Sequence, residues 1–253
     1  SFFKVRLGKP LTFVGLFNFG RILQDYKLAH SLKVTLAYVA ITVAIQVVLG
    51  LLLALLFHQE IKGKTIWRAL LILPIFCTPV AVGYLGLTVF YEEGGPVNSI
   101  LMSLFNLKIP WLSHPTWAWV SVLLLDIWQW TPFCFLVILA GLQSLSEEVY
   151  DAAYIDSSSE WQIFRKITFP LIQPVVIIVF LLRLIESFKI FDIIFSLTGG
   201  GPGTATEVYS LYTYRTGLRF FDFGYASALS YLLLAIVMVV VNLFFRRIRQ
   251  VYE

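Results

Sequence analysis

The stretch VTLAYVAITVAIQVVLGLLLALLF, residues 34–57, decides the class of this protein. It carries no charged side chain along its whole length. The hydrocarbon core of a bilayer is about 30 Å thick, and roughly 20 apolar residues in a helix cross it. The stretch therefore predicts a transmembrane helix.

The composition of the whole chain agrees with that prediction. Of its 253 residues, 58% are hydrophobic and only 13% are charged, and the mean hydropathy is +0.82. Soluble domains contain about 45–50% apolar and about 25% charged residues. These numbers exclude a soluble globule, a disordered chain and a disulfide scaffold. The net charge of +4 comes from dispersed basic residues, so no nucleic-acid surface is indicated.

Four more apolar runs follow, and together the five predict an all-α polytopic membrane protein. The further runs are Ile66–Phe90, Trp117–Leu139, Pro174–Leu197 and Tyr225–Phe245. Prolines 74, 79 and 132 lie inside two of them and predict kinks. Because the chain starts at Ser1 without a methionine, we expect a sixth helix before it. Residues 1–33 would then be an external N-terminal segment, and residues 34–253 the transmembrane domain.

Lysine and arginine counts give the orientation. Residues 58–65, residues 140–173 and the tail after residue 245 hold most of the basic residues near the spans, which places them in the cytoplasm. The first 33 residues contain six lysines and arginines that would lie outside. The numbers of basic residues on the two sides of the membrane are therefore nearly equal. A preceding helix would fix the orientation of that segment.

The loop at residues 144–170 carries the sharpest local signal. Ser144 with Glu147, and Ser157 with Glu160, form two capping-box patterns. They predict a first helix over residues 145–155 and a second one that stops before Pro170. Both helices have an apolar stripe. Such a helix–turn–helix could dock on a partner protein or lie on the bilayer surface.

Residues in this loop resemble the EAA loop of ABC importer permeases. The segment DAAYIDSS (151–158) corresponds to the family pattern E-A-A-x-x-D-G-A, and Phe164, Ile167 and Pro170 follow at the family spacing. Segments that resemble the carbohydrate-importer branch are LTGGGPGT (197–204), FFDFGYASA (220–228) and GPVN (95–98) with Trp111-Leu112. The resemblance extends over nearly the whole chain from about Phe13.

The resemblance implies a coupling role for this loop. In the family, the loop sits in a cleft of a separate ATPase and transmits its closure to the membrane helices. By position, the coupling residues would be Asp151, Ala152, Ala153, Asp156, Ser157, Ser158 and Phe164. Two positions depart from the pattern: Asp151 replaces Glu, and Ser157 replaces the Gly best able to take a positive φ. We expect docking on the ATPase to survive with altered contacts, or the partner ATPase to have an adjusted cleft.

The sequence contains no ATP-hydrolysing or metal-binding motif. The glycine-rich segment 199–203 is not followed by the lysine of a phosphate-binding loop. We interpret it as a flexible external turn, or as a loop that meets a solute-delivering protein. The three histidines are scattered, and Cys77 and Cys134 read as free buried thiols. The chain itself would hold no cofactor, and ATP and Mg would bind to the partner ATPase.

Charged residues inside the apolar runs are the candidates for a solute pathway, because ionisable groups are costly at membrane depth. The candidates are Asp126, Trp128, Gln129, Arg183, Glu186, Lys189 and Asp192. The last four recur every three residues and would drift along one helical face. They could neutralise one another, or Asp126 could pair with Arg183. Alternatively they could line a path, with Trp128 or Trp130 facing a sugar ring.

The prediction is therefore a permease subunit of an ABC importer in a prokaryotic plasma membrane, moving a sugar or sugar-like solute by alternating access. Its partners would be an ATPase dimer, a second permease subunit, an extracytoplasmic solute-binding protein and the lipid bilayer. Glycerol phosphate, a polyamine or a peptide are alternative solutes. A membrane enzyme or a channel is the weaker alternative class, because it leaves the loop at 144–170 unexplained.

Overall fold

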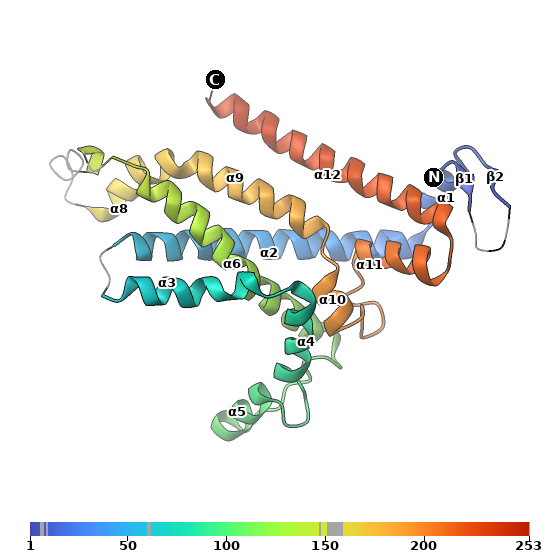
Figure 1. Ribbon diagram of the computed structural model, residues 1–253, viewed down its shortest axis with the longest axis horizontal. Coiled ribbons are helices and arrows are strands. Elements are labelled where there is room, and N and C mark those ends of the chain that lie inside the picture. Colours follow the sequence, from blue (N-terminus) through green and yellow to red (C-terminus); the bar gives the residue numbers. More distant parts are fainter. Residues whose placement is uncertain (6–7, 9, 60–61, 147, 151–158, 253) are drawn as a thin grey trace.

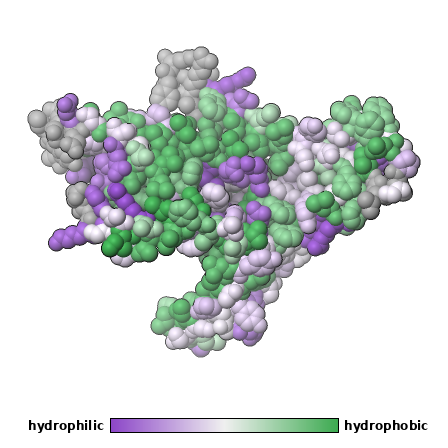
Figure 2. All heavy atoms as spheres, in the orientation of Figure 1, coloured by the Kyte–Doolittle hydropathy of each residue, from purple (hydrophilic) through white to green (hydrophobic). Residues whose placement is uncertain are grey.

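The computed structural model describes all residues except 6–7, 9, 60–61, 147, 151–158 and 253. The described chain is mainly helical, and its long helices run side by side in Figure 1. A small hairpin of β1 (Phe3–Lys4) and β2 (Thr12–Phe13) precedes them. Hydrophobic side chains cover much of the surface in Figure 2. An all-α polytopic architecture is thus confirmed.

Four helices in the described part of the chain are long and apolar enough to cross a membrane, and counting a bent helix pair as one span gives up to five. They are α2 (Tyr26–His58), α6 (Pro115–Gln143), α9 (Phe169–Phe188) together with the residues from 160, and α12 (Phe223–Tyr252). α2 packs along α6 and α9, and the core lies between these three. α12 is the most peripheral span, because only 11% of its apolar window is buried.

The second apolar run is broken, whereas the sequence predicts one kinked span. It forms α3 (Lys64–Ile72), a 3-10 turn η1 (Leu73–Phe76) and α4 (Pro79–Val89), with a bend of 101°. Cys77 and Thr78 are extended between them. A residue before proline avoids the helical region, and Pro79 donates no N–H. The two prolines therefore break the span.

The fourth run is also interrupted, which corrects the expectation of one continuous charged face. α9 ends at Phe188, and a short α10 (Asp192–Leu197) follows. α10 packs closely on α4, where a Cβ at Gly83 would fall 1.8 Å from Ser196 Oγ. The second halves of the two interrupted runs, α4 and α10, therefore lie against each other.

The loop after α6 differs from its predicted capping. Ser144 ends α6 and donates its hydroxyl to Gly141 O (2.8 Å), so it closes a helix and does not open one. Ser146 Oγ accepts from Glu148 N (3.3 Å) at the start of the next helical turn. The residues of the first predicted helix from 151 onward lie outside the described residues.

The second predicted helix does not stop before Pro170. It starts as α8 (Glu160–Ile163), passes through a π-helical turn η2 (Phe164–Thr168) and continues as α9. The N–H of Phe169 bonds to the carbonyl of Phe164, five residues earlier. A π turn changes the carbonyl pairing just where Pro170 lacks a donor. The helix can therefore pass the proline and enter the membrane span.

The end of the molecule opposite α8 gathers the remaining elements (Figure 1). These are α1 (Phe17–Ile22), α11 (Tyr209–Tyr214) and the π turn η3 (Arg215–Arg219). α5 (Pro96–Phe105) projects beyond α4. The N-terminal segment is attached here, because Phe223 N donates to Val5 O (3.1 Å) and Arg21 pairs with Asp222 (3.0 Å). Residues 26–33, assigned to that segment from sequence, belong to α2.

Candidate functional site

A buried polar cluster joins α2, α6 and α9 at the centre of the apolar core. Gln46 Nε2 donates to Asp126 Oδ2 (2.7 Å), and Arg183 Nε donates to Gln46 Oε1 (2.9 Å). Arg183 Nη2 lies 3.8 Å from Asp126 Oδ2. The side chains of Arg183 and Asp126 are only 3% and 1% exposed. Of the alternatives that the sequence left open for these charges, the pairing of Asp126 with Arg183 is therefore present, with Gln46 as the bridge.

Trp130 and Ser187 complete the surroundings of Arg183. The guanidinium carbon lies 4.5 Å from the centre of the Trp130 ring, a cation–π arrangement. Arg183 Nη2 also donates to Ser187 Oγ (3.3 Å). The charge of Arg183 is thus satisfied from α6 and from its own helix.

One turn further along α9, a second ion pair is exposed. Lys189 Nζ lies 2.7 Å from Glu186 Oε1, and both side chains are more than half exposed. Asp192 lies in the first turn of α10, three residues after Lys189. Because the helix is broken between them, Asp192 does not extend the α9 face.

These two groups of charges share a cavity of about 210 Å³. It is lined by Pro79, Asp126, Trp130, Arg183, Glu186, Ser187, Lys189, Ile190, Phe191 and Asp192. It therefore collects five of the seven pathway candidates at the place where both broken spans are interrupted. The arrangement offers carboxylate and ammonium groups and an indole ring at membrane depth.

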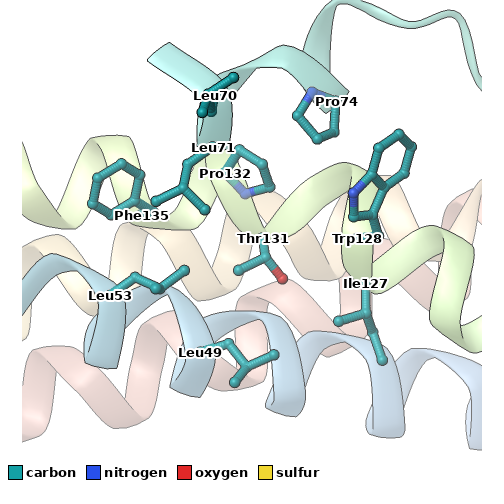
Figure 3. Close-up of a pocket in the computed structure, with 10 residues that line it drawn as sticks. All are labelled: Leu49, Leu53, Leu70, Leu71, Pro74, Ile127, Trp128, Thr131, Pro132 and Phe135. Atoms are coloured by element: carbon teal, nitrogen blue, oxygen red, sulfur yellow. The ribbon is translucent and has the colours of Figure 1, made fainter. Parts of the chain in front are cut away.

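The other two pathway candidates lie elsewhere. Trp128 points to a separate apolar pocket on the other side of α6 (Figure 3). Gln129 Nε2 donates to the carbonyl of Cys77 (2.8 Å) and so holds the break between η1 and α4. Of the two tryptophans considered from sequence, Trp130 is the one at the charged cavity.

Gln46 was missed from sequence, although a signal was present. It is the one amide within an otherwise apolar stretch that also includes Thr42, and it is fully buried. A buried polar group requires hydrogen-bond partners, so a lone glutamine in mid-span indicates a partner on another helix.

Six of the seven coupling candidates, residues 151–153 and 156–158, lie outside the described residues. Phe164 is described and begins the π turn, where its ring lies 5.5 Å from that of Trp161 and 5.9 Å from that of Phe169. Trp161 itself is exposed. Aromatic side chains thus cluster at the N-terminal end of α9.

The glycine-rich segment 199–203 is held firmly, contrary to its interpretation as a flexible turn. Arg215 donates to both Glu207 and the carbonyl of Gly199. Trp119 Nε1 donates to Ala205 O (2.6 Å), and His30 Nε2 lies 3.0 Å from Thr204 O. The loop is therefore a fixed surface anchored to α2, α6 and α11–η3.

Asp25 is the hub of the same end of the molecule. It caps α2 through Lys27 N and Leu28 N and accepts from the hydroxyls of Tyr212 (2.6 Å) and Tyr225 (2.7 Å). Burial raises the pKa of Asp25, but these hydrogen bonds outweigh it and hold the pKa below the ordinary 3.8. The carboxylate therefore ties α2 to α11 and α12.

No group of three or more potential metal ligands occurs among the residues that the structure describes. Cys134 is buried, whereas Cys77 is exposed, which corrects the prediction that both thiols are buried.

Comparison with known proteins gives consistent matches. Residues 27–253 match the family described as "Binding-protein-dependent transport system inner membrane component". A relative from Sinorhizobium fredii, "Probable ABC transporter permease protein y4oQ", is 37% identical over 92% of this chain and 75% of its own length. The "Trehalose/maltose transport system permease protein MalF" of Thermococcus litoralis is 36% identical over 89% of this chain and 76% of its own length.

A solved structure has the same fold. It is described as "Crystal structure of bacterial alginate ABC transporter in complex with alginate pentasaccharide-bound periplasmic protein". One of its chains superposes with a TM-score of 0.87 at 25% identity, covering 94% of this chain and 84% of that one.

Proposed function

The chain belongs to the binding-protein-dependent transport system inner membrane components, and from that membership we propose that it translocates a sugar or sugar-like solute. It is a multi-pass plasma-membrane permease subunit of an ABC importer and not an enzyme. ATP and Mg would bind to a separate ATPase dimer. The observation that supports a solute path in this chain is the charged cavity beside the two broken spans.

The cavity suits a neutral polyhydroxylated solute. Three carboxylates and two cations line it, so it has no excess of positive charge for a phosphate. Glu186 and Lys189 can accept and donate hydrogen bonds to hydroxyl groups, and Trp130 presents an indole ring. The name of one relative, trehalose/maltose, supports the same class of solute, and the similar solved structure is of a transporter that imports a saccharide that is acidic, alginate. Glycerol phosphate, polyamines and peptides are the competing solutes.

The size of the cavity supports a second permease subunit. At about 210 Å³ it is smaller than the roughly 300–1,000 Å³ of typical ligand pockets. A path for a saccharide would then be completed by another chain facing α9. A solute-binding protein would deliver the solute to the external side, where the anchored loop at 199–207 offers a fixed surface.

Transport would proceed by alternating access. ATP-driven closure of the ATPase dimer would move the loop at 144–170, in which we propose that Asp151, Ala152, Ala153, Asp156, Ser157, Ser158 and Phe164 dock. The continuous helix from Glu160 to Phe188 would carry this movement to the cavity. A ligand shifts such an equilibrium only if it binds the two states with different affinity.

Co-purification tests the partners. The tagged full-length chain is expressed together with its partner subunits and purified in mild detergent. We expect an ATPase and a second permease to co-purify with it. Ser157→Arg is expected to lose the ATPase, because a long cation is introduced at the docking loop. Ser103→Arg on α5 is the matched control and should retain it. A chain that purifies alone, or a Ser157→Arg variant that keeps its ATPase, would overturn the coupling assignment.

Uptake tests the solute. Proteoliposomes with the whole complex and its binding protein would be offered trehalose, maltose and alginate oligosaccharides, with glycerol phosphate, spermidine and a peptide mixture as competitors. ATP-dependent accumulation of a saccharide is expected. Accumulation of one of the other solutes alone would replace the sugar assignment.

A further inference from the structure

The break between η1 and α4 is held by a side chain from another helix. Cys77 and Thr78 are extended there, with φ of −76° and −67° and ψ of 135° and 140°. In an unbroken helix each carbonyl accepts from the N–H four residues later, and an extended residue turns its carbonyl away from that donor. Gln129 Nε2 of α6 supplies a donor instead, at 2.8 Å from Cys77 O. The geometry of the break therefore depends on α6.

Gln129 is buried, and only one end of its amide has a partner. The residue is 1% exposed. Its Oε1 is buried and has no hydrogen-bond partner among the residues that the structure describes. An unpaired buried acceptor carries a free-energy penalty that an apolar side chain of the same shape would avoid. The bond to Cys77 is thus the described contact that accounts for an amide at this position.

The break adjoins the charged cavity. Pro79, the first residue of α4, lines this cavity together with Asp192, the first residue of α10. Asp126 and Trp130, which lie three residues before and one residue after Gln129, line it from α6. Gln129 therefore connects the α6 wall of the cavity to the start of the wall that α4 forms, without lining the cavity itself.

The helices that follow the two breaks are packed too closely to move independently. A Cβ at Gly83 of α4 would lie 1.8 Å from Ser196 Oγ of α10. A Cβ at Gly86 would lie 2.9 Å from Leu197 Cδ1 of the same helix. Close-packed interiors have little free volume and transmit strain. A change in the direction of α4 at its break is therefore passed on to α10, and the two helices form one wall of the cavity.

We propose that Gln129 is a positioning residue for transport, which holds Cys77 and thereby fixes the α4–α10 wall of the solute path. This inference rests on the proposed function and deepens it. Gln129 acts through the main chain of residue 77 and not by contact with the solute, so its assignment to the path lining is replaced by a supporting one. Without its bond the wall takes up a wider range of positions, and ATP hydrolysis is converted into uptake less efficiently.

Distances between spin labels on α2 and α4 test the position of the wall. The labels are attached to Val48→Cys and Tyr84→Cys in the intact complex, because these two positions are 54% and 57% exposed. The background is Cys77→Ala, with buried Cys134 retained. The bond from α6 uses the main-chain carbonyl of residue 77, so Cys77→Ala preserves it. Pulsed electron paramagnetic resonance then gives the distance distribution without nucleotide.

Gln129→Met is the test variant, since methionine is unbranched like glutamine but has no donor. We expect it to broaden the distance distribution. Thr131→Val is the matched control: Thr131 is another buried polar residue of α6, its hydroxyl also has no hydrogen-bond partner among the described residues, and it lines the apolar pocket of Figure 3. It should leave the distribution unchanged. Equal distributions in Gln129→Met and the parent, or equal broadening by both variants, would overturn the proposal.

The ratio of uptake to ATP hydrolysis separates positioning from stability. Proteoliposomes with the whole complex and its binding protein are given ATP and radiolabelled trehalose. We expect trehalose accumulated per ATP hydrolysed to fall about fivefold in Gln129→Met, as for the loss of one net hydrogen bond, and to be unchanged in Thr131→Val. A merely structural role would lower the amount of complex and leave this ratio as it is.

A ratio in Gln129→Met equal to that of the wild type would therefore overturn the positioning role. If the wild-type complex accumulates no trehalose, the uptake result bears on the proposed solute. The distance measurement needs no solute, so it still decides the role of Gln129 in that case.

Discussion

Two cations face the same cavity, Arg183 within α9 and Lys189 directly after its last residue, and they are held in opposite ways. Arg183 is almost completely buried and is bound by groups from α2, α6 and its own helix. Lys189 is 56% exposed, and among the described residues its ion pair is with Glu186 of α9. From sequence the two belong to one alternating series of charges. The structure separates them into a group that holds helices together and a group that is free to change partner.

The difference follows from solvation. Removing one partner of a buried ion pair costs about 3–5 kcal/mol, because the other charge is left without compensation. An exposed pair is worth about 0–1 kcal/mol, because water replaces the lost partner. Glu186 and Lys189 can therefore exchange each other for solute hydroxyls at little cost, whereas Asp126 and Arg183 cannot.

The largest expected effect is that of Arg183→Met. It leaves Asp126 buried without its cation, with Gln46 still donating to it, so we expect a loss of about 3–5 kcal/mol in the free energy of unfolding. Thermal unfolding of the purified complex, and the amount of chain in the membrane, measure it. Arg219→Met is the control for a cation that is exposed. If Arg183→Met were as stable as the control, the distinction between the buried and the exposed cation would be contradicted.

Removing both charges should restore most of that stability. Asp126→Leu combined with Arg183→Met leaves no unpaired charge, and replacement of buried ion pairs by apolar residues is often neutral or stabilising by about 1–4 kcal/mol. The same unfolding measurement applies. Stability that stays as low as in Arg183→Met would show that the cluster contributes more than charge compensation. Uptake by the double variant then shows whether the pair also serves transport.

Glu186→Gln and Lys189→Gln should change stability little and solute uptake strongly, unlike the substitutions of the buried pair. We expect the free energy of unfolding to change by less than about 1 kcal/mol. Solute uptake should fall about tenfold for each, as expected when a hydrogen bond to a charged group, worth about 1.5 kcal/mol or more, is lost. The ratio of uptake to ATP hydrolysis in proteoliposomes is the readout. Uptake at the wild-type level in both variants would remove these residues from the path.

The smallest effect concerns a carboxylate outside the spans. The pKa of Asp25 lies below 3.8, so its stabilising effect is complete above about pH 5 and is lost as the pH falls below 4. Asp25→Asn removes the stabilisation that depends on the ionised carboxylate. The melting temperature of the variant should therefore depend less on pH between 5 and 3 than that of the wild type. The difference at pH 7 should be about 1 kcal/mol, since Asn also caps helices. Parallel pH profiles would contradict the role of the Tyr212–Asp25–Tyr225 network.

Hydrophobicity in the sequence predicted the apolar spans, and charge within them left the Asp126–Arg183 pair as one of several alternatives, because both depend on the cost of polar groups in hydrocarbon. The breaks at residues 77–78 and 189–191 were not predicted. A proline signals a kink, but its angle depends on packing such as that of Gly83 against Ser196. The choice of Trp130 over Trp128 likewise depends on how α6 is rotated against α9. Pro170 was taken as a helix stop, and a π turn accommodates it.

The accessibility of residue 189 to water tests the central claim most directly. In a Cys77→Ala background, with buried Cys134 retained, Lys189→Cys and Val48→Cys would be labelled with a hydrophilic maleimide in membranes. Val48 is 54% exposed, within the apolar run of α2. Because maleimide reacts with thiolate, which forms in water, we predict that position 189 reacts at least about tenfold faster and that its rate changes when ATP and vanadate trap the ATPase. Equally slow labelling at both positions would contradict a solute path along Glu186 and Lys189. A labelling rate at position 189 that is the same with and without ATP and vanadate would also contradict it.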